Sequence, residues 1–374
     1  MKNSVLVFGF SILTIGFSCG QDSVNQVNIP QKVPFTSELI IDEMQIPWGM
    51  TFLPDGALLI TEKTGEIIHF KEGKKTTITN VPEVYNRGQG GLLDIELHPD
   101  YSKNGWIYIS YASPEGDEKG GNTALMRAKL KDNALVDNQL LYKATPNTTK
   151  GEHFGSRIEF DNDGYLFLSI GERGDRDVNP QDITRDGGKI YRFNDDGSIP
   201  ADNPFVTVAG AKKAIYSYGH RNPQGMVKHP QTGEIWDHEH GPRGGDEINI
   251  VKPGKNYGWP IITYGINYSG TPITDKTAME GMEQPIHYWL PSIAPSGMSF
   301  VTTDTYGADW KGSLLVGSLA FQYLERLEFD GTKVTNREKL MADIGRVRDV
   351  KEGPDGLIYV AVEGKGIYRL VPKL

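Results

Sequence analysis

One sequence pattern occurs six times along the chain, and this repeat constrains the fold more than any other feature. Each copy has a short apolar segment, a turn rich in Pro, Asp and Gly, and a second segment of aromatic and β-branched residues. Such a pattern predicts a β-hairpin, which must bury its faces against neighbouring copies. The chain is therefore expected to be an all-β, six-bladed β-propeller around a central channel. The copies span residues 48–61, 92–112, 156–172, 224–241, 296–320 and 348–366.

Two β-sandwiches are the alternative architecture. They would explain the many turns equally well, but they would not explain six copies of one pattern. In the propeller, the strand around Leu39 to Asp42 is expected to complete the sheet of the last repeat and so close the ring. Helices are expected to be scarce, because no long stretch has a hydrophobic period of 3.6 residues.

The N-terminus has the form of a bacterial lipoprotein export signal. After Lys2, an apolar run from Val5 to Phe17 leads to Cys19, the only cysteine of the chain. The run is shorter than the roughly 20 residues that span a bilayer. We expect residues 1–19 to be a signal peptide with lipidation at Cys19, or plain secretion as the alternative. Residues 20–36 would be a polar tether and 37–374 the propeller domain. The predicted location is the periplasm or the outer membrane, as an exported lipoprotein without disulfides.

The charge balance narrows the possible partners. The chain carries a net charge of -9 and has no block of five or more like charges, which argues against a nucleic-acid surface. Membrane contact is expected only through the lipid at Cys19. Local groups of arginines in such an acidic chain favour a small anionic ligand.

Polar residues stand at or just before the first strand of each repeat, at positions that we call the heads of the repeats. Equivalent positions in a propeller lie at the same end and at similar distances from the axis. Residues scattered along the sequence are therefore expected to form one pocket at one mouth of the channel. They are Gln89, Glu152, His153, Arg221, Asn222, Ser296, Arg346 and Arg348.

The arginines and the histidine of this set indicate an anion-binding site with a general base. Three guanidinium groups can hold a multiply charged anion, since each binds carboxylate or phosphate bidentately. Ion pairing with Asp246 or Asp349 is the alternative. His153 is the candidate general base, because a neutral imidazole accepts a proton near pH 7, and Glu152 beside it could orient it.

The segment HGPRGGDE, residues 240–247, offers closely spaced oxygen ligands. The carbonyl groups of Gly241 and Pro242 and the carboxylates of Asp246 and Glu247 favour calcium. A zinc pair made by the histidines at positions 238 and 240 is the weaker alternative, because no third ligand is evident.

Several motifs together resemble those of a known family. They are PWGMTFLPDG, GQGGLLDIELHPDY, YGHRNPQGM, HEHGPRGGDEINIVKPGKNYGWP and GRVRDVKEGPDGLIYV. On these motifs the chain is similar to the soluble sugar dehydrogenases that depend on pyrroloquinoline quinone (PQQ), the glucose/sorbosone dehydrogenase family, and in particular to its bacterial aldose sugar dehydrogenase branch. The resemblance implies a quinoprotein oxidoreductase that uses PQQ and Ca²⁺ and oxidises the anomeric hydroxyl of aldoses to lactones by hydride transfer.

The resemblance also implies a role for each site residue. His153 corresponds to the catalytic base, and Gly241 and Pro242 to the carbonyl ligands of the calcium at the quinone. Glu247 and the Tyr257 carbonyl correspond to ligands of a second calcium. The implied cofactor contacts are Gln89, Arg221, Asn222, Ser296, Arg346 and Arg348, and the implied sugar contacts are Gln89, Glu152 and Arg173.

One departure and two alternatives remain. Glucose-specific members carry a lysine near the quinone where this chain has Ala320, which implies weaker cofactor binding and a broad range of sugars. A cytochrome or a quinone is expected to accept the electrons. The alternative functions are a carbohydrate-binding propeller without enzymatic activity and a calcium-dependent propeller lactonase.

Overall fold

The structure is a computed structural model that describes residues 35–373. The predicted signal segment, Cys19 and most of the predicted tether lie outside these residues. The first strand, β1 (Phe35–Asp42), begins at Phe35, whereas the predicted boundary assigned residues 35 and 36 to the tether. Within 35–373, no helix has the length and apolar character needed to cross a bilayer.

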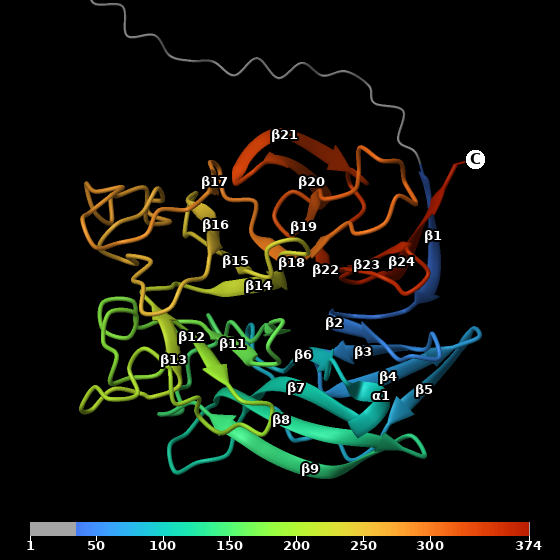
Figure 1. Ribbon diagram of the computed structural model, residues 1–374, viewed down its shortest axis with the longest axis horizontal. Coiled ribbons are helices and arrows are strands. Elements are labelled where there is room, and N and C mark those ends of the chain that lie inside the picture. The colour runs from blue at the N-terminus through green and yellow to red at the C-terminus, as the bar shows by residue number, and fades with distance from the viewer. Residues whose placement is uncertain (1–34, 374) are drawn as a thin grey trace, which may run out of the picture. The chain divides into compact units, whose positions relative to one another are not determined.

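Six four-stranded antiparallel sheets surround a central axis, which confirms the predicted six-bladed propeller (Figure 1). The first blade comprises β2 (Pro47–Phe52), β3 (Leu58–Glu62), β4 (Glu66–Lys71) and β5 (Lys74–Ile78). The second comprises β6 (Leu92–Leu97), β7 (Trp106–Ser113), β8 (Asn122–Lys131) and β9 (Ala134–Lys143). The third comprises β10 (Ile158–Phe160), β11 (Leu166–Ile170), β12 (Lys189–Phe193) and β13 (Ile215–Tyr218).

The second half of the chain repeats this arrangement. The fourth blade comprises β14 (Pro223–Lys228), β15 (Ile235–Glu239), β16 (Asp246–Ile250) and β17 (His287–Trp289). The fifth comprises β18 (Pro295–Phe300), β19 (Leu314–Ser318), β20 (Tyr323–Asp330) and β21 (Lys333–Leu340). The sixth comprises β22 (Val347–Glu352), β23 (Ile358–Val362), β24 (Gly366–Pro372) and β1. The single helix among the described residues is α1 (Tyr101–Asn104), as the scarcity of helical periodicity predicted.

The strand β1 closes the ring as predicted. It pairs antiparallel with β24, and Leu39 lies opposite Tyr368. The last blade therefore takes its outer strand from the beginning of the domain, as Figure 1 shows where blue β1 lies beside red β24. This closure joins the two ends of the described chain through backbone hydrogen bonds and leaves no gap between the first and last blades.

Each of the six sequence repeats forms the two inner strands of one blade. In Figure 1 the first strand of a blade lies toward the axis and the last strand lies at the periphery. The hairpin turns carry glycines in the left-handed region, such as Gly56 (φ 80°) and Gly164 (φ 83°), a conformation that favours glycine. Apolar side chains between successive blades form the core, for example Ile67 and Ile107 between the first and second blades. Burial between blades explains why no single repeat could fold alone.

Charged side chains line the channel beneath its mouth. Arg157 pairs with Asp94 (2.9 Å) and with Asp349 (3.1 Å), and all three are buried. They border a cavity of about 130 Å³. Arg157 therefore joins the second, third and sixth blades, and this partner of Asp349 is not one of the three arginines singled out in the sequence.

Candidate active site

Hydrogen bonds between neighbouring heads form a ring at the end of the channel where the first strands begin. This ring brings the predicted head positions to one mouth, although the third and fourth heads alone are about 70 residues apart along the chain. The links are Lys63 with Gly90, Gln89 with Gly151, Gly155 with Asn222, His240 with Pro295, Arg346 with Leu319, and Gly364 with Gln45.

His153 faces a carboxylate that the sequence analysis did not identify. The ring atom Nδ1 contacts Oε1 of Glu172, which follows β11 and is only 2% exposed. The expectation that Glu152 orients the imidazole is therefore corrected. With Glu172 ionised, Nδ1 carries the ring proton and Nε2 is the nitrogen that can accept one.

The loop that carries His153 is held from two neighbouring heads. The side-chain oxygen of Gln89 accepts the backbone N–H of His153 (2.8 Å), and Oδ1 of Asn222 accepts that of Gly155 (3.0 Å). These contacts support a backbone in the left-handed region, with φ 55° at His153. A Cβ at Gly171 would lie 2.3 Å from the His153 carbonyl, so only glycine allows this close approach.

The surroundings of His153 keep its imidazole neutral. Burial lowers the pKa of His153, the hydrogen bond with Glu172 opposes that effect, and the positive charge of Arg221 lowers the pKa further. An imidazole whose pKa lies below 6.5 is unprotonated at pH 7. The side chain can therefore act as a general base at neutral pH.

Arg346 and Arg348 share one carboxylate at the mouth. Nε of Arg346 donates to Glu363 (2.5 Å), and Nε of Arg348 donates to its other oxygen (2.9 Å). Arg348 also donates to the Gln224 side chain (3.1 Å) and is 9% exposed, whereas the Arg346 side chain is 48% exposed. Two guanidinium groups with one carboxylate leave an excess positive charge, as an anion site requires.

Arg221 and Asn222 lie at the head of the fourth blade. Nη1 of Arg221 donates to the carbonyls of His240 (2.8 Å) and Gly241 (2.9 Å). Among residues 35–373, the buried amide nitrogen Nδ2 of Asn222 has no hydrogen-bond partner. A buried donor without a partner is costly and fits a site whose ligand supplies an acceptor.

Asp246 is not placed as a metal ligand, which corrects the prediction. Its carboxylate accepts hydrogen bonds from the backbone of Gly241 (2.8 Å), Ile293 (2.7 Å) and Ala294 (3.0 Å) and from the Ser292 hydroxyl. These donors use the lone pairs that a metal would need. Asp246 instead fastens the 240–245 loop to the segment before β18.

Glu247 and Tyr257 border a small pocket. Its volume is about 10 Å³, close to that of one water-sized group, and Glu239, Gly241 and Arg221 also line it. Burial, followed by the nearby Glu239 carboxylate, raises the pKa of Glu247. A buried carboxylate, Glu239, and a half-buried one, Glu247, around such a space fit a hard cation with oxygen ligands.

Two further predicted contacts are corrected, because their side chains are buried. The Ser296 hydroxyl donates to the Val347 carbonyl (2.5 Å) and is 1% exposed, so it joins blades and does not face the mouth. Arg173, also 1% exposed, stacks on the Phe154 ring (3.5 Å to the centroid) and donates to carbonyls such as that of Lys150 (2.9 Å). It supports the His153 loop from below and is shielded from a sugar.

The zinc alternative also fails on geometry. Nε2 of His238 contacts the Ser296 carbonyl, and Nε2 of His240 contacts the Pro295 carbonyl. The two rings therefore link the fourth blade to the fifth through backbone carbonyls. Their Nε2 atoms do not converge on one ion.

Lys63 is a cation at the mouth that the sequence analysis missed. Its ammonium donates to Asn86 (2.8 Å) and to the Gly90 carbonyl (3.1 Å), beside the Gln89 loop. Burial lowers the pKa of Lys63, and the nearby Arg348 charge lowers it further.

Ala320, at the position where the family resemblance places a lysine, is exposed beside the mouth. Ala320 follows the second strand of its blade, as Glu172 does, and both residues lie at the mouth end of the channel.

The sequence and the fold match known proteins. Residues 44–369 match the family described as glucose/sorbosone dehydrogenase. The chain is 42% identical to the aldose sugar dehydrogenase YliI of Escherichia coli over 87% of this chain and 89% of that protein. The crystal structure of the soluble aldose sugar dehydrogenase of Escherichia coli in its apo form superposes with a TM-score of 0.87 at 40% identity, covering 91% of this chain and all of that one (100%).

A structure with bound cofactor is also similar. The PQQ-bound aldose sugar dehydrogenase of Streptomyces coelicolor has a TM-score of 0.74 and 27% identity, covering 91% of this chain and 99% of that one. The chain belongs to the glucose/sorbosone dehydrogenase family. The family predicted from the motifs and the predicted class of enzyme, a sugar dehydrogenase, are thereby confirmed.

Proposed function

We propose that this protein oxidises the anomeric hydroxyl of aldoses to lactones with PQQ as cofactor and Ca²⁺ as its metal. The observation that carries the proposal is the neutral His153, oriented by Glu172 at the same mouth as the three arginines. Support also comes from the Escherichia coli relative, an aldose sugar dehydrogenase, and from the Streptomyces coelicolor enzyme with bound PQQ.

In this proposal His153 moves the proton. Nε2 takes the proton of the anomeric hydroxyl, and the Glu172 carboxylate stabilises the imidazolium that forms. PQQ, when bound, supplies the acceptor for the hydride that leaves the anomeric carbon. The loop contacts of Gln89 and Asn222 keep the imidazole in place while the sugar binds.

Residues of the mouth fit both groups. The guanidinium groups of Arg221, Arg346 and Arg348 would neutralise the carboxylates of PQQ, and Nδ2 of Asn222 would donate to an acceptor on it. The carbonyls of Gly241 and Pro242 would bind the calcium beside the cofactor. Glu247 and the Tyr257 carbonyl would bind a second calcium in the small pocket that they border.

The setting of the enzyme is part of the proposal. Export and lipidation at Cys19 would place the propeller in the periplasm or at the outer membrane. There a cytochrome or a quinone would reoxidise the cofactor. Sugar contacts through Gln89 and Glu152 also remain predictions.

The test is reconstitution of the purified protein with PQQ and Ca²⁺, followed by dye reduction with several aldoses. We expect dye reduction that requires PQQ, and loss of about 10²- to 10⁴-fold in turnover in His153→Gln. The matched control is His69→Gln, since His69 lies on β4 away from the mouth. Sugar binding without dye reduction would favour the carbohydrate-binding alternative, and hydrolysis of added lactone without PQQ would favour the lactonase.

A further inference from the structure

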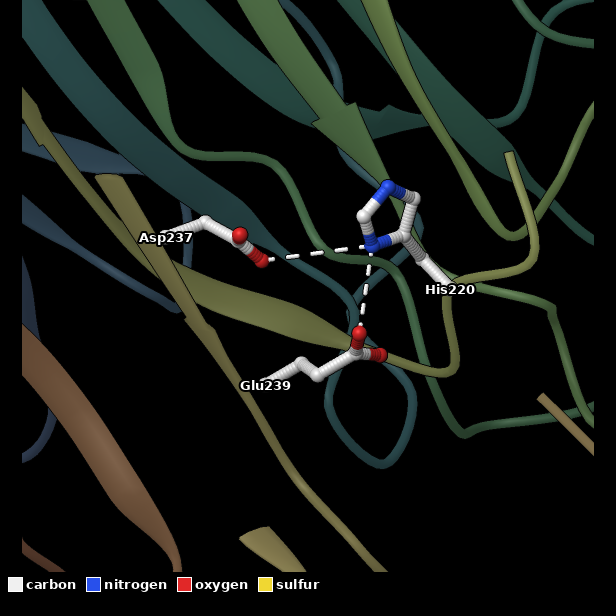
Figure 2. Close-up of side chains that lie close together, drawn as sticks. All are labelled: His220, Asp237 and Glu239. Atoms are coloured by element: carbon white, nitrogen blue, oxygen red, sulfur yellow. Dashed lines mark hydrogen bonds and ion pairs between the residues drawn. The ribbon is translucent and has the colours of Figure 1, made fainter. Parts of the chain in front are cut away.

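A buried cluster of one imidazole and two carboxylates lies beneath the mouth of the fourth blade. His220 precedes β14, and Asp237 and Glu239 belong to β15. Figure 2 shows both carboxylates directed at the same ring nitrogen of His220. Nδ1 lies 3.1 Å from Oε1 of Glu239 and 4.0 Å from Oδ2 of Asp237, and all three residues are buried.

The local structure fixes these groups toward one another. Asp237 and Glu239 are two positions apart on a strand, so they project from the same face of the sheet. The His220 ring stacks on Tyr257, with centroids 4.4 Å apart, and its Nε2 contacts the Ser217 hydroxyl (2.8 Å). A histidine held in this way at one nitrogen presents the other to a ligand, as metal-binding histidines do.

The charges of the cluster are not balanced by protein groups. Neither oxygen of Asp237, which is 0% exposed, has a hydrogen-bond partner within the described part of the chain. Glu247, which is half-buried, lies opposite Glu239 in the ladder between β15 and β16 and adds a third carboxylate. In residues 35–373, His220 is the basic side chain that forms ion pairs with Asp237 and Glu239. Buried charges of one sign require a counter-ion or protons.

We propose that Nδ1 of His220 and the carboxylates of Asp237 and Glu239 bind a divalent cation of the zinc class. Ligand atoms about 2.1 Å from one ion lie at most about 4.2 Å apart, and the separations of 3.1 Å and 4.0 Å fall within this limit. An imidazole nitrogen selects such ions over calcium, which prefers oxygen ligands. The site shares Glu239 with the space at Glu247 and Tyr257, but His220 and Asp237 do not line that space.

The ion would fasten the segment that carries Arg221 and Asn222. Glu239 already accepts the backbone N–H of Arg221, so an ion on Glu239 and His220 would tie this segment to β15 at two points. The role is structural, and the proposal does not rest on sugar oxidation. Removal of the ion is expected to lower the melting temperature of the protein whether or not PQQ is present.

The test measures the metal content of the full-length protein produced with zinc and dialysed against excess calcium. We expect about one equivalent of zinc per chain by mass spectrometry, and visible d–d bands when cobalt replaces it. Asp237→Asn and His220→Gln are each expected to lose the zinc. The matched control, Glu247→Gln, changes the neighbouring carboxylate and is expected to keep it.

Three results would overturn the proposal. They are wild-type protein without zinc, zinc retained in Asp237→Asn, and calcium alone in the cluster. If a substituted protein does not fold, the wild type decides the question. A cobalt spectrum without the d–d bands of nitrogen and oxygen ligation contradicts the proposed ligand set.

Discussion

Nδ1 of His153 lies against Oε1 of Glu172, although the two residues are 19 positions apart and belong to opposite ends of a hairpin in the sequence. This contact sets the tautomer of the imidazole and leaves Nε2 to accept a proton. Glu172→Gln is expected to lower kcat by about 10²- to 10⁴-fold, because the amide cannot stabilise the imidazolium. It also removes an interaction that raises the pKa of His153, so the acidic limb of the pH profile moves to lower pH.

The measurement is kcat/KM against pH for the wild type and Glu172→Gln, with Glu152→Gln as the matched control. Glu152→Gln is expected to keep the acidic limb where the wild type has it, because Glu152 is the weakest of the causes that act on His153. The same limb in Glu172→Gln and the wild type would contradict the assigned contact.

The pH dependence of the wild type follows from the lowered pKa of His153. Burial is the main cause, and it favours the neutral form. Activity is expected to rise with pH through a pKa below 6.5 and to be level at neutral pH. The stability of the fold is also expected to decrease as pH falls, because the unfolded state binds the His153 proton more readily than the folded state. The contribution of His153 to the free energy of unfolding therefore decreases as pH drops below 6.5. A kinetic pKa above 7 would show that another group controls the rate.

The two arginines that share Glu363 are expected to respond differently to substitution. Arg346→Gln should weaken PQQ binding about tenfold with little change in melting temperature, because this side chain is half exposed. Arg348→Gln should weaken binding and also destabilise the fold, because its guanidinium is buried against Gln224. Titration of the protein with PQQ and thermal unfolding give both quantities. Equal loss of stability in both variants would contradict the difference in burial.

Substitution of Arg173 tests whether this residue supports the His153 loop or contacts the sugar. Its buried guanidinium stacks on Phe154 and supports the loop of His153. Arg173→Gln is therefore expected to lower the melting temperature and kcat while the KM for sugar stays the same. Steady-state kinetics with one aldose separate the two parameters. A higher KM with normal kcat and stability would restore the predicted sugar contact.

Asp246 gives a prediction about stability. Its carboxylate accepts three backbone N–H groups, and Asp246→Asn would turn an amide nitrogen toward at least one of them. The expected loss is about 1 to 3 kcal/mol in the free energy of unfolding. Urea unfolding measures it, and Ser292→Ala, which removes a single donor to the same carboxylate, is the control. An unchanged stability in Asp246→Asn would show that the carboxylate is not the anchor of the loop.

The fold and the gathering of the candidate site residues could be predicted from sequence because a repeat converts spacing along the chain into position in space. The six hairpins, the closing strand β1 and the gathering of His153 and Arg221 at one mouth all follow from this geometry. Glu172 was missed because the predicted ring of polar residues was taken only from positions just before the first strand of each repeat. The chain returns to the same mouth after the second strand, where Glu172 and Ala320 lie.

The incorrect assignments have a common physical cause. Asp246, Ser296 and Arg173 have the side chains that cofactors and sugars use, but in this fold they form hydrogen bonds with backbone groups of the protein. Those backbone partners come from distant segments, and any residue type offers the same N–H and C=O groups. The sequence therefore does not reveal that backbone groups, and not a ligand, form hydrogen bonds with these side chains.

The central claim is that His153 removes a proton from an aldose at a PQQ site in the channel mouth. Its most direct test is a single turnover of PQQ-loaded protein mixed with an aldose, followed by the absorbance of oxidised PQQ. We predict fast loss of this absorbance in the wild type and in His69→Gln, and loss slower by about 10²- to 10⁴-fold in His153→Gln at unchanged PQQ affinity. Reduction of PQQ by His153→Gln at the wild-type rate would contradict the account.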